Sequence, residues 1–497
     1  MSKIEGMRRF LSSSIGVTCA VALSLPLTLS ASAAPRPPAA EASVPGATQS
    51  IPLVPLAPPG SDRAAGPAGA EQGLGRRTVR PFSMVGVVWH DPDTELHGRV
   101  QVRTREAGTP RWSGWQDIDT HNHDHAADPD TAERTSGRVR GSTAPLWVGR
   151  SDGVEVRVRA ESRPATGTAD DGAHPDDGAH PDDGARPDDG ARPDDGARPN
   201  DRHRPDDRAY AGDLAPPASR SALPEGMRLE LVDPGAEPAP GGALPAGSAR
   251  LGTLGSETAA AVPNTELAPL GSAEIPALSQ EETRKQLVGV RPGAKPYIGP
   301  RPRIVTRRGW GADERLRESG FRYTKRVKAA FVHHTASGNK YRCSQAPSLI
   351  RSIYRYHVVS SGWRDIGYNF LVDRCGHIYE GRAGGVARAV MGAHTLGFNA
   401  NSMGIAVLGS YNSAKPPAAA VRAISKLTAW KLGLYGANPR GKTYLTSGGG
   451  NLYRKGKKVR LHVISGHRDG FATECPGRRL YGKLGKTRST AANLQGR

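Results

Sequence analysis

The chain has 497 residues, enough for two or three domains, and its 61 glycines and 41 prolines make up about a fifth of it. That share is too large for one compact domain, and it lacks the period of three that marks collagen. Residues 301–497 hold 36 lysines and arginines against 8 acidic residues, a net charge of +28, which leaves −8 for residues 1–300. We therefore expect a packed, basic C-terminal domain behind a partly disordered N-terminal half.

Residues 1–34 have the pattern of a secretory signal. A basic start precedes an apolar stretch from about Ile15 to Leu29, and Ala31-Ser32-Ala33 offers a cleavage site. A membrane anchor is the alternative, but the stretch is short for a span and Pro26 interrupts it. The prediction is an exported protein with no membrane span once the signal is removed.

The next segments alternate between linker and strand patterns. Residues 35–75 are rich in Pro, Ala and Gly and predict a disordered linker. Residues 76–235 contain short valine- and tryptophan-rich runs separated by turn signals, which predict a small all-β domain. Its expected strands are Met84–Trp89, Gly98–Arg105, Pro145–Val148, Val154–Val158 and Met227–Val232.

A six-residue repeat interrupts this β-rich domain. From Gly172, the unit Gly-Ala-His/Arg-Pro-Asp-Asp recurs until it degenerates near Arg208. A period of six also occurs in β-helices, but this unit has no apolar residue larger than Ala or Pro, so stacked copies would bury nothing. We expect a disordered insert over about 162–220. A second linker is predicted over 236–300, with one short helical stretch near Ser279–Leu287.

Residues 301–497 predict an α/β (α+β) domain with a mixed central β-sheet flanked by helices. Short apolar runs predict its strands, and two longer segments carry apolar residues at helical spacing. The expected strands are Ala329–His333, Tyr368–Val372, Ile378–Tyr379, Gly404–Leu408 and Val459–Ile464, and the expected helices are Ser348–Val358 and Ala418–Leu434.

Two histidines and one cysteine of this domain suit a catalytic zinc. His333 and its neighbour His334 end a predicted strand, His467 follows another, and Cys475 lies eight residues beyond His467. Three protein ligands leave the fourth position of the metal to water, as catalytic zinc sites do. Ordinary buried histidines and a spare thiol are the alternative, because this spacing alone is weak evidence.

The cysteine count bears on the same question. Cys19 falls in the predicted signal, which leaves three cysteines, and an odd number in an exported protein gives one thiol another task. With Cys475 as a metal ligand, Cys343 and Cys375 can pair as a structural disulfide.

Several motifs of residues 301–497 follow one another in a specific order. They are Arg307–Ala312, Ala330–Ala336, Gly362–Phe370, Ile378–Arg382, Gly392–Thr395 with Asn401–Ile405, and Gly466–Asp469 with Thr473–Gly477. This set resembles the peptidoglycan recognition protein family, which is homologous to the phage-type zinc N-acetylmuramoyl-L-alanine amidases. The β-rich region before Arg301 resembles the N-terminal region of secreted actinobacterial members.

The resemblance implies a zinc site and its ligands. His333, His467 and Cys475 match the family's ligands. His333 is favoured over His334 because the phage-type enzymes have their ligand directly after the apolar strand, where Val332-His333 lies, and because neighbours in a strand face opposite ways, only one of the two is expected to bind. Zinc, as Zn²⁺, is therefore the expected cofactor. His334 is expected to pack or to hydrogen-bond behind the site.

Further roles follow from the same resemblance. Tyr368 matches the catalytic tyrosine. Thr473 stands where phage-type enzymes carry a lysine and amidase-competent recognition proteins carry a threonine. Glu380 is interpreted as a structural or groove residue rather than a proton donor. The substrate-binding candidates are His394, Thr395, Asn399 and Arg382.

The implied function is that of a secreted, cell-wall-associated zinc amidase, which hydrolyses the bond between N-acetylmuramic acid and L-alanine in peptidoglycan. The alternative is a peptidoglycan-binding recognition protein without catalysis, although such members usually lack the cysteine ligand. The charge of +28 attracts polyanions, and for an exported protein anionic wall polymers are better partners than nucleic acid. The basic run Arg454–Arg460 either contributes to such binding or forms a solvated hairpin.

One more histidine group stands apart from these motifs. His121, His123 and His125, together with Asp124, have the residue types of a metal site. They lie in a polar loop without a cysteine or a fixed scaffold, so the favoured interpretation is a loop without a functional site.

Overall fold

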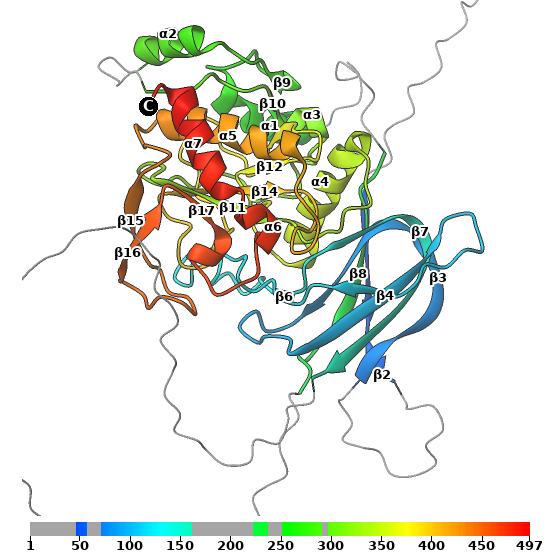
Figure 1. Cartoon of the computed structure of the whole chain (residues 1–497). Coiled ribbons are helices and arrows are strands. Elements are labelled where there is room, and N and C mark those ends of the chain that lie inside the picture. The colour runs from blue at the N-terminus through cyan, green and yellow to red at the C-terminus, as the bar shows by residue number, and fades with distance from the viewer. Residues whose placement is uncertain (1–45, 57–70, 162–221, 237–250, 291–296) are drawn as a thin grey trace, which may run out of the picture. The chain divides into compact units, whose positions relative to one another are not determined.

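Figure 1 shows the computed structural model of the chain. It describes residues 46–56, 71–161, 222–236, 251–290 and 297–497. The predicted signal and the six-residue repeat lie outside these residues. Within the described ranges, no helix combines the length and the apolar character needed to cross a membrane.

The N-terminal half forms an antiparallel sheet of eight strands, as its valine-rich runs predict. The strands are β1 (Ala47–Pro52), β2 (Val54–Pro55), β3 (Glu71–Trp89), β4 (Gly98–Glu106), β5 (Gln116–Ile118), β6 (Gly141–Ser142), β7 (Leu146–Ala160) and β8 (Arg228–Asp233). Their order is β1-β8-β3-β7-β4-β5, and β2 and β6 each pair with β3. Alternate residues of β4 and β7, such as Val100 and Val156, are buried in its core.

Two segments predicted as linkers contain regular structure, so those predictions are wrong in part. β1 pairs along its whole length with β8, from Ala47 opposite Asp233 to Pro52 opposite Arg228. Residues 251–290 contain α1 (Leu251–Ala261), η1 (Val262–Asn264), β9 (Glu274–Ile275) and α2 (Gln280–Val290). The helix predicted near Ser279–Leu287 is confirmed as α2. A few apolar residues such as Ile275, which is fully buried, fix these elements within an Ala/Pro/Gly-rich background.

The C-terminal half contains the predicted mixed sheet flanked by helices. Its seven strands run in the order β17-β11-β14-β12-β13-β10-β9. Their bounds are β10 (Ile304–Val305), β11 (Ala329–His334), β12 (Phe370–Val372), β13 (Ile378–Glu380), β14 (Ser402–Val407) and β17 (Ile464–Gly466). β11, β14 and β17 pair in parallel, as do β12 with β14 and β10 with β13, whereas β12–β13 and β10–β9 are antiparallel.

Helices cover both faces of this sheet (Figure 1). α5 (Ala418–Gly433) and α7 (Leu484–Gln495) share a core with Ile405 and Val407 of β14. α4 (Ala346–Arg355), which continues into η3 (Tyr356–Ser360), packs with the alternate residue Ala406 on the opposite face. The shorter helices are α3 (Arg307–Trp310), η2 (Cys343–Gln345), η4 (His467–Asp469) and α6 (Arg478–Tyr481).

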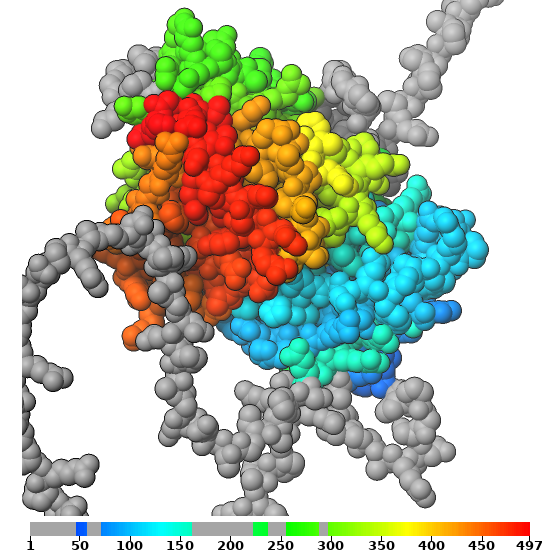
Figure 2. Space-filling model, in the orientation of Figure 1, coloured from blue at the N-terminus to red at the C-terminus, as the bar shows by residue number. Residues whose placement is uncertain are grey.

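The single strand predicted over Val459–Ile464 is two strands in different sheets. β16 (Lys458–His462) pairs with β15 (Lys442–Thr446) in a separate hairpin, and β17 joins the central sheet beside β11. A continuous apolar pattern cannot show that the chain changes sheets between His462 and Ile464. The hairpin, orange in Figure 2, lies at the molecular surface and carries part of the basic run Arg454–Arg460.

The two large sheets belong to one unit spanning residues 43–497 and share a hydrophobic cluster. Met84 and Trp147 of the N-terminal sheet are buried in the same cluster as Leu349 and Ile353 of α4. The hydroxyl of Tyr356 donates to the carbonyl oxygens of Val87 and Thr143, at 3.3 and 3.1 Å. The N-terminal sheet is therefore packed against the C-terminal domain rather than tethered to it. The predicted disulfide between Cys343 and Cys375 is present, with 32 residues of sequence separation.

Candidate metal centre

The parallel pairing of β11 with β17 brings two of the predicted ligands together. Val332 lies opposite Gly466 in the register of these strands, so the next residues, His333 within β11 and His467 just after β17, lie at the same carboxyl end of the two strands. Both side chains are fully buried, and their ring centroids are 4.5 Å apart. Strand pairing alone thus places two histidines that are 134 positions apart in the sequence side by side.

The third predicted ligand comes from the loop after η4. The backbone amide of Cys475 donates to the hydroxyl of Thr473 at 3.1 Å, and its carbonyl accepts from the amide of Arg468 at 3.0 Å. These two bonds hold the loop so that the sulfur of Cys475 lies 3.7 Å from Nδ1 of His333. Cys475 is buried and outside the disulfide.

A fourth side chain joins this cluster from the N-terminal half, and the prediction that its loop lacks a fixed scaffold is wrong. His125 lies in the coil between β5 and β6, and its Nε2 is 3.6 Å from the sulfur of Cys475. Its ring centroid is 5.2 Å from that of His333 and 4.5 Å from that of His467. The C-terminal domain supplies the cysteine and the fixed scaffold that the polar loop lacks. The histidine-rich run 121–125 was the only sequence signal for this residue.

The donor set fits a zinc ion. One ligand atom from each of His125, His333, His467 and Cys475 lies within 4.8 Å of every other, and all four residues are buried. A zinc–sulfur bond of about 2.3 Å and a zinc–nitrogen bond of about 2.0–2.1 Å at a tetrahedral angle separate sulfur from nitrogen by about 3.6 Å. Both measured sulfur–nitrogen distances match this value. Neither ring nitrogen of His467 forms a hydrogen bond among the described residues, so one is left to bind a metal, and Nδ1 lies 3.7 Å from a carboxylate oxygen of Asp124.

Burial sets the protonation of these residues. It lowers the pKa of His467 to about 3. It also lowers the pKa of His333 well below its usual value, and the neighbouring histidines lower the pKa of His333 further. Both imidazoles are therefore neutral at pH 7, which is the form that binds a metal. Burial also raises the pKa of the Cys475 thiol, so a cation is required to stabilise the thiolate that zinc binds.

The neighbour of His333 faces away from the cluster, as the alternation along a strand predicts. Nδ1 of His334 accepts a hydrogen bond from the backbone amide of Tyr411 at 3.2 Å. His334 therefore supports the strand edge from behind, and the structure brings His333, rather than His334, to the other ligands.

Two candidate catalytic residues border the cluster. Tyr368 precedes β12, is 4% exposed, and its ring centroid is 5.6 Å from that of His333. Tyr368 and Thr473 line the same small pocket beside Cys475. Burial, and then the nearby Cys475 and Asp124, raise the pKa of the Tyr368 hydroxyl, which stays a hydrogen-bond donor at neutral pH.

Three of the predicted substrate-binding residues form a buried turn behind His333. The hydroxyl of Thr395 lies 3.4 Å from Nε2 of His333, which leaves Nδ1 to face the sulfur. Oδ1 of Asn399 accepts from the backbone amides of His394 and Thr395. His394 is fully buried and packs edge-on to His333. This turn orients the His333 ring.

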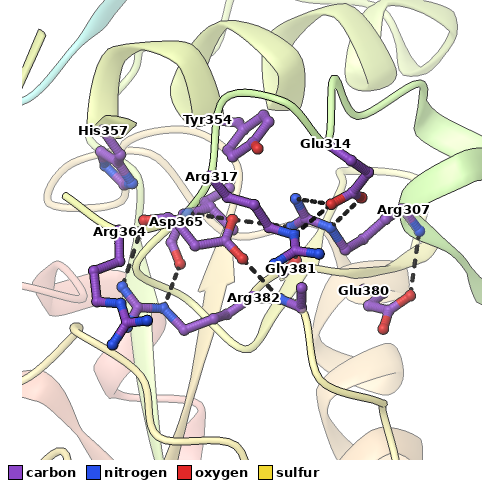
Figure 3. A network of polar contacts seen from close by, with 12 residues as sticks. Arg307, Glu314, Arg317, Tyr354, His357, Arg364, Asp365, Glu380, Gly381 and Arg382 are labelled. Carbon is purple, nitrogen blue, oxygen red and sulfur yellow. Dashed lines mark hydrogen bonds and ion pairs between the residues drawn. The ribbon is translucent and has the colours of Figure 1, made fainter. Parts of the chain in front are cut away.

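Arg382, the fourth candidate, belongs to a buried polar network (Figure 3). Its Nε donates to the carbonyl of Ile366 at 2.9 Å, and both terminal nitrogens donate to Glu133 at 2.8 Å. In the same network Arg307 donates to Glu314 and to Asp365, at 2.7 and 3.0 Å. Arg382 therefore has a carboxylate partner within this chain.

Glu380 has a structural environment, in line with its interpretation. Its carboxylate accepts from the side-chain amide of Asn264 and from the backbone amide of Arg307, at 2.8 and 3.2 Å. Burial raises its pKa to about 7.

Known protein families match both halves of the chain. Residues 36–186 match a family described as Rv3811 N-terminal galactose-binding domain-like, and residues 323–478 match N-acetylmuramoyl-L-alanine amidase. Peptidoglycan-recognition protein SC2 of Drosophila simulans is 33% identical over 181 residues, which cover 36% of this chain and 84% of that protein. Human N-acetylmuramoyl-L-alanine amidase is 33% identical over 159 residues, or 31% of this chain and 23% of that protein. Among solved structures, wild-type Drosophila PGRP-LB has 25% sequence identity and a TM-score of 0.29, and the match covers 36% of this chain and 91% of that one.

Proposed function

The chain belongs to the peptidoglycan-recognition protein family, and from this premise we propose that it is a zinc-dependent N-acetylmuramoyl-L-alanine amidase. Its substrate is the amide bond between N-acetylmuramic acid and L-alanine in peptidoglycan. The observation that carries the proposal is the buried cluster of His333, His467 and Cys475 with Tyr368 beside it. Members without catalysis usually lack this cysteine.

The residues of the site have separate roles in hydrolysis. Bound zinc would supply hydroxide at neutral pH and polarise the amide carbonyl. Tyr368 keeps its proton and can donate a hydrogen bond to the oxyanion that develops on that carbonyl. The Thr473 hydroxyl, in the same pocket, is a second donor. Thr395 keeps the ring of His333 in the orientation that presents Nδ1.

Replacing Tyr368 with phenylalanine is expected to lower hydrolysis by about 10²–10³-fold, the usual effect of losing one oxyanion donor, while zinc content stays unchanged. The measurement is the initial rate of alanine N-terminus release from purified sacculi, together with metal analysis. Tyr379→Phe is the matched control, because it also removes a buried hydroxyl, one bonded to Asp373 at 3.0 Å. The rates are compared in the His125→Ala chain, where the metal would keep a position for water, and equal non-zero rates with and without Tyr368→Phe would remove Tyr368 from the mechanism.

The proposal as a whole is tested by metal content and by new alanine N-termini from sacculi. Because His125 stands where a fourth ligand would bind, both measurements are made on the full chain and on the full chain with His125→Ala. Stoichiometric zinc and new alanine N-termini support the proposed enzyme. A chain that binds no zinc, or that produces no new alanine N-terminus in either form, is not the proposed zinc amidase.

The four-ligand cluster favours one alternative, a recognition protein that binds peptidoglycan without cutting it. A zinc ion with four protein ligands is the arrangement of structural sites, which do not hydrolyse substrates. Binding of soluble muropeptides without formation of new alanine N-termini, even after His125→Ala, would favour this alternative.

Export and wall association are part of the proposal. The disulfide between Cys343 and Cys375 supports an oxidising compartment, and the predicted signal supports secretion. N-terminal sequencing of the protein recovered outside the cell tests this.

Binding to anionic wall polymers through the basic run Arg454–Arg460 is a separate part of the proposal. It is tested by measuring binding to sacculi and to DNA at two salt concentrations, and a preference for DNA would count against it.

A further inference from the structure

The coil between β5 and β6, residues 119–140, lies over the candidate metal centre; we refer to it as the plug segment (cyan beside β6 in Figure 1). It belongs to the N-terminal half, yet several of its polar side chains bond to the C-terminal domain. Asp124 and Glu133 are 1% and 4% exposed, which is unusual for acidic residues in a connecting coil. Because buried carboxylates need hydrogen-bond or ion-pair partners, this coil must pack against a surface that supplies them.

The first contact of the plug segment is with the metal ligands. Asp124 bonds to Nδ1 of His125 at 2.7 Å, which turns Nε2 of that ring toward Cys475. A carboxylate on the outer nitrogen of a metal-binding histidine is the usual way in which the ring is oriented. His125 thus completes a set of four protein ligands, and such a set leaves no position for water or substrate.

The second contact is with residues proposed to bind substrate. Glu133 forms a bidentate pair with Arg382, at 2.8 Å to each terminal nitrogen, and both side chains are almost fully buried. Oδ1 of Asp128 accepts from the side-chain amide of Asn399 at 2.7 Å and from the backbone amide of Gly397 at 2.8 Å. Carboxylates of the plug segment therefore bond to the donors that a carboxylate-bearing peptide would use.

Further bonds hold the plug segment at both ends. The backbone amide of Leu396 donates to the carbonyl of Asp124 at 3.0 Å, and that of Arg140 donates to the carbonyl of Ser361 at 3.1 Å. The closed arrangement thus rests on bonds at both ends of the segment and on two buried acidic side chains.

We propose that the plug segment is a built-in inhibitor: His125 is a fourth, displaceable metal ligand, and Glu133 and Asp128 occupy the substrate groove. This inference rests on the proposed zinc amidase function. Opening breaks no covalent bond: His125 leaves the metal, and Glu133 releases Arg382. A substrate with free carboxylates competes for the same donors, so the full chain is latent until the segment is displaced.

The test uses the full chain with cobalt in place of zinc, because the visible spectrum of cobalt reports its ligands. The probe is acetohydroxamate, a small ligand that binds an accessible metal. The cobalt spectrum of the unaltered chain is expected to stay constant during the titration, whereas that of His125→Ala shifts saturably. His121→Ala is the matched control, because it changes a histidine of the same segment whose side chain is 75% exposed, and it should behave like the unaltered chain.

Hydrolysis of sacculi provides the second readout. If the closed form is populated more than about nine-tenths of the time, His125→Ala raises the rate by about tenfold or more. Glu133→Gln changes no metal ligand but weakens the pair with Arg382, which favours the open form in which His125 has left the metal. Acetohydroxamate is therefore expected to shift the cobalt spectrum of Glu133→Gln, and this test remains available if His125→Ala does not fold.

The outcomes separate this inference from the function on which it rests. Equal acetohydroxamate binding by the unaltered chain and by His125→Ala overturns the plug. Failure of every variant to bind cobalt or zinc overturns the proposed metal site. A His125→Ala chain that binds cobalt and acetohydroxamate but forms no new alanine N-termini supports the plug and overturns catalysis.

Discussion

Replacing His333 with glutamine is expected to abolish zinc binding and peptidoglycan hydrolysis, whereas the same change at the adjacent His334 leaves both. Nδ1 of His333 lies 3.7 Å from the sulfur of Cys475, and the ring of His334 bonds instead to the amide of Tyr411. Loss of residues that only orient metal ligands lowers metal affinity by about 10–100-fold, so loss of a ligand should cost more.

The comparison of these two variants is informative because His333 and His334 are adjacent histidines and both are buried. Zinc affinity is measured by competition with a chromogenic chelator, and hydrolysis is measured in the His125→Ala chain. Folding is checked by circular dichroism, since both rings are buried. Zinc loss in His334→Gln with zinc retained in His333→Gln would reverse the assignment of the ligand.

Removing the side chain of Arg307 is expected to have the largest effect on stability. Its guanidinium is 3% exposed and pairs with Glu314 and with Asp365, which are 5% and 8% exposed (Figure 3). Arg307→Ala leaves two buried carboxylates without this partner, and breaking such a buried pair costs about 3–5 kcal/mol. That loss is a large part of the free energy of unfolding of a typical domain, which is roughly 5–15 kcal/mol.

Two control variants bracket this effect. Arg315 forms an ion pair with Asp313 at 2.8 Å, but its side chain is 57% exposed, so Arg315→Ala should cost no more than about 1 kcal/mol. Arg307→Lys keeps the charge but cannot form the same forked contacts, and an intermediate loss is expected. The free energy of unfolding in urea provides the comparison. A loss below about 1 kcal/mol in Arg307→Ala would show that the network is not needed for stability.

The C-terminal sheet and three residues of the candidate metal centre were predictable from the sequence. Val332-His333 closes an apolar run, and the motifs around His467 and Cys475 have a fixed order, so strand pattern and resemblance agree there. The division of Val459–Ile464 between two sheets was not predictable, because both strands have the same alternation.

His125 could not be found by the same reasoning. It is separated from His333 by 208 positions, and the residues around it are polar, as in a solvated loop. Its environment is created by packing of the two sheets, through contacts such as Tyr356 with Val87, and no local pattern encodes these contacts. The buried acidic residues Asp124 and Glu133 were hidden for the same reason.

The hydrophobic cluster shared by the two sheets has a thermodynamic consequence. Met84, Trp147 and Ile353 lose the same solvent-free environment whichever half of the chain melts first. Melting of one half therefore exposes apolar surface of the other, and the heat absorbed belongs to a common transition rather than to two independent ones. A calorimetric scan of the full chain should show one endotherm for the two sheets. The thermal stability of the candidate metal centre then depends on both halves of the chain, including the N-terminal half, which carries none of the three predicted ligands.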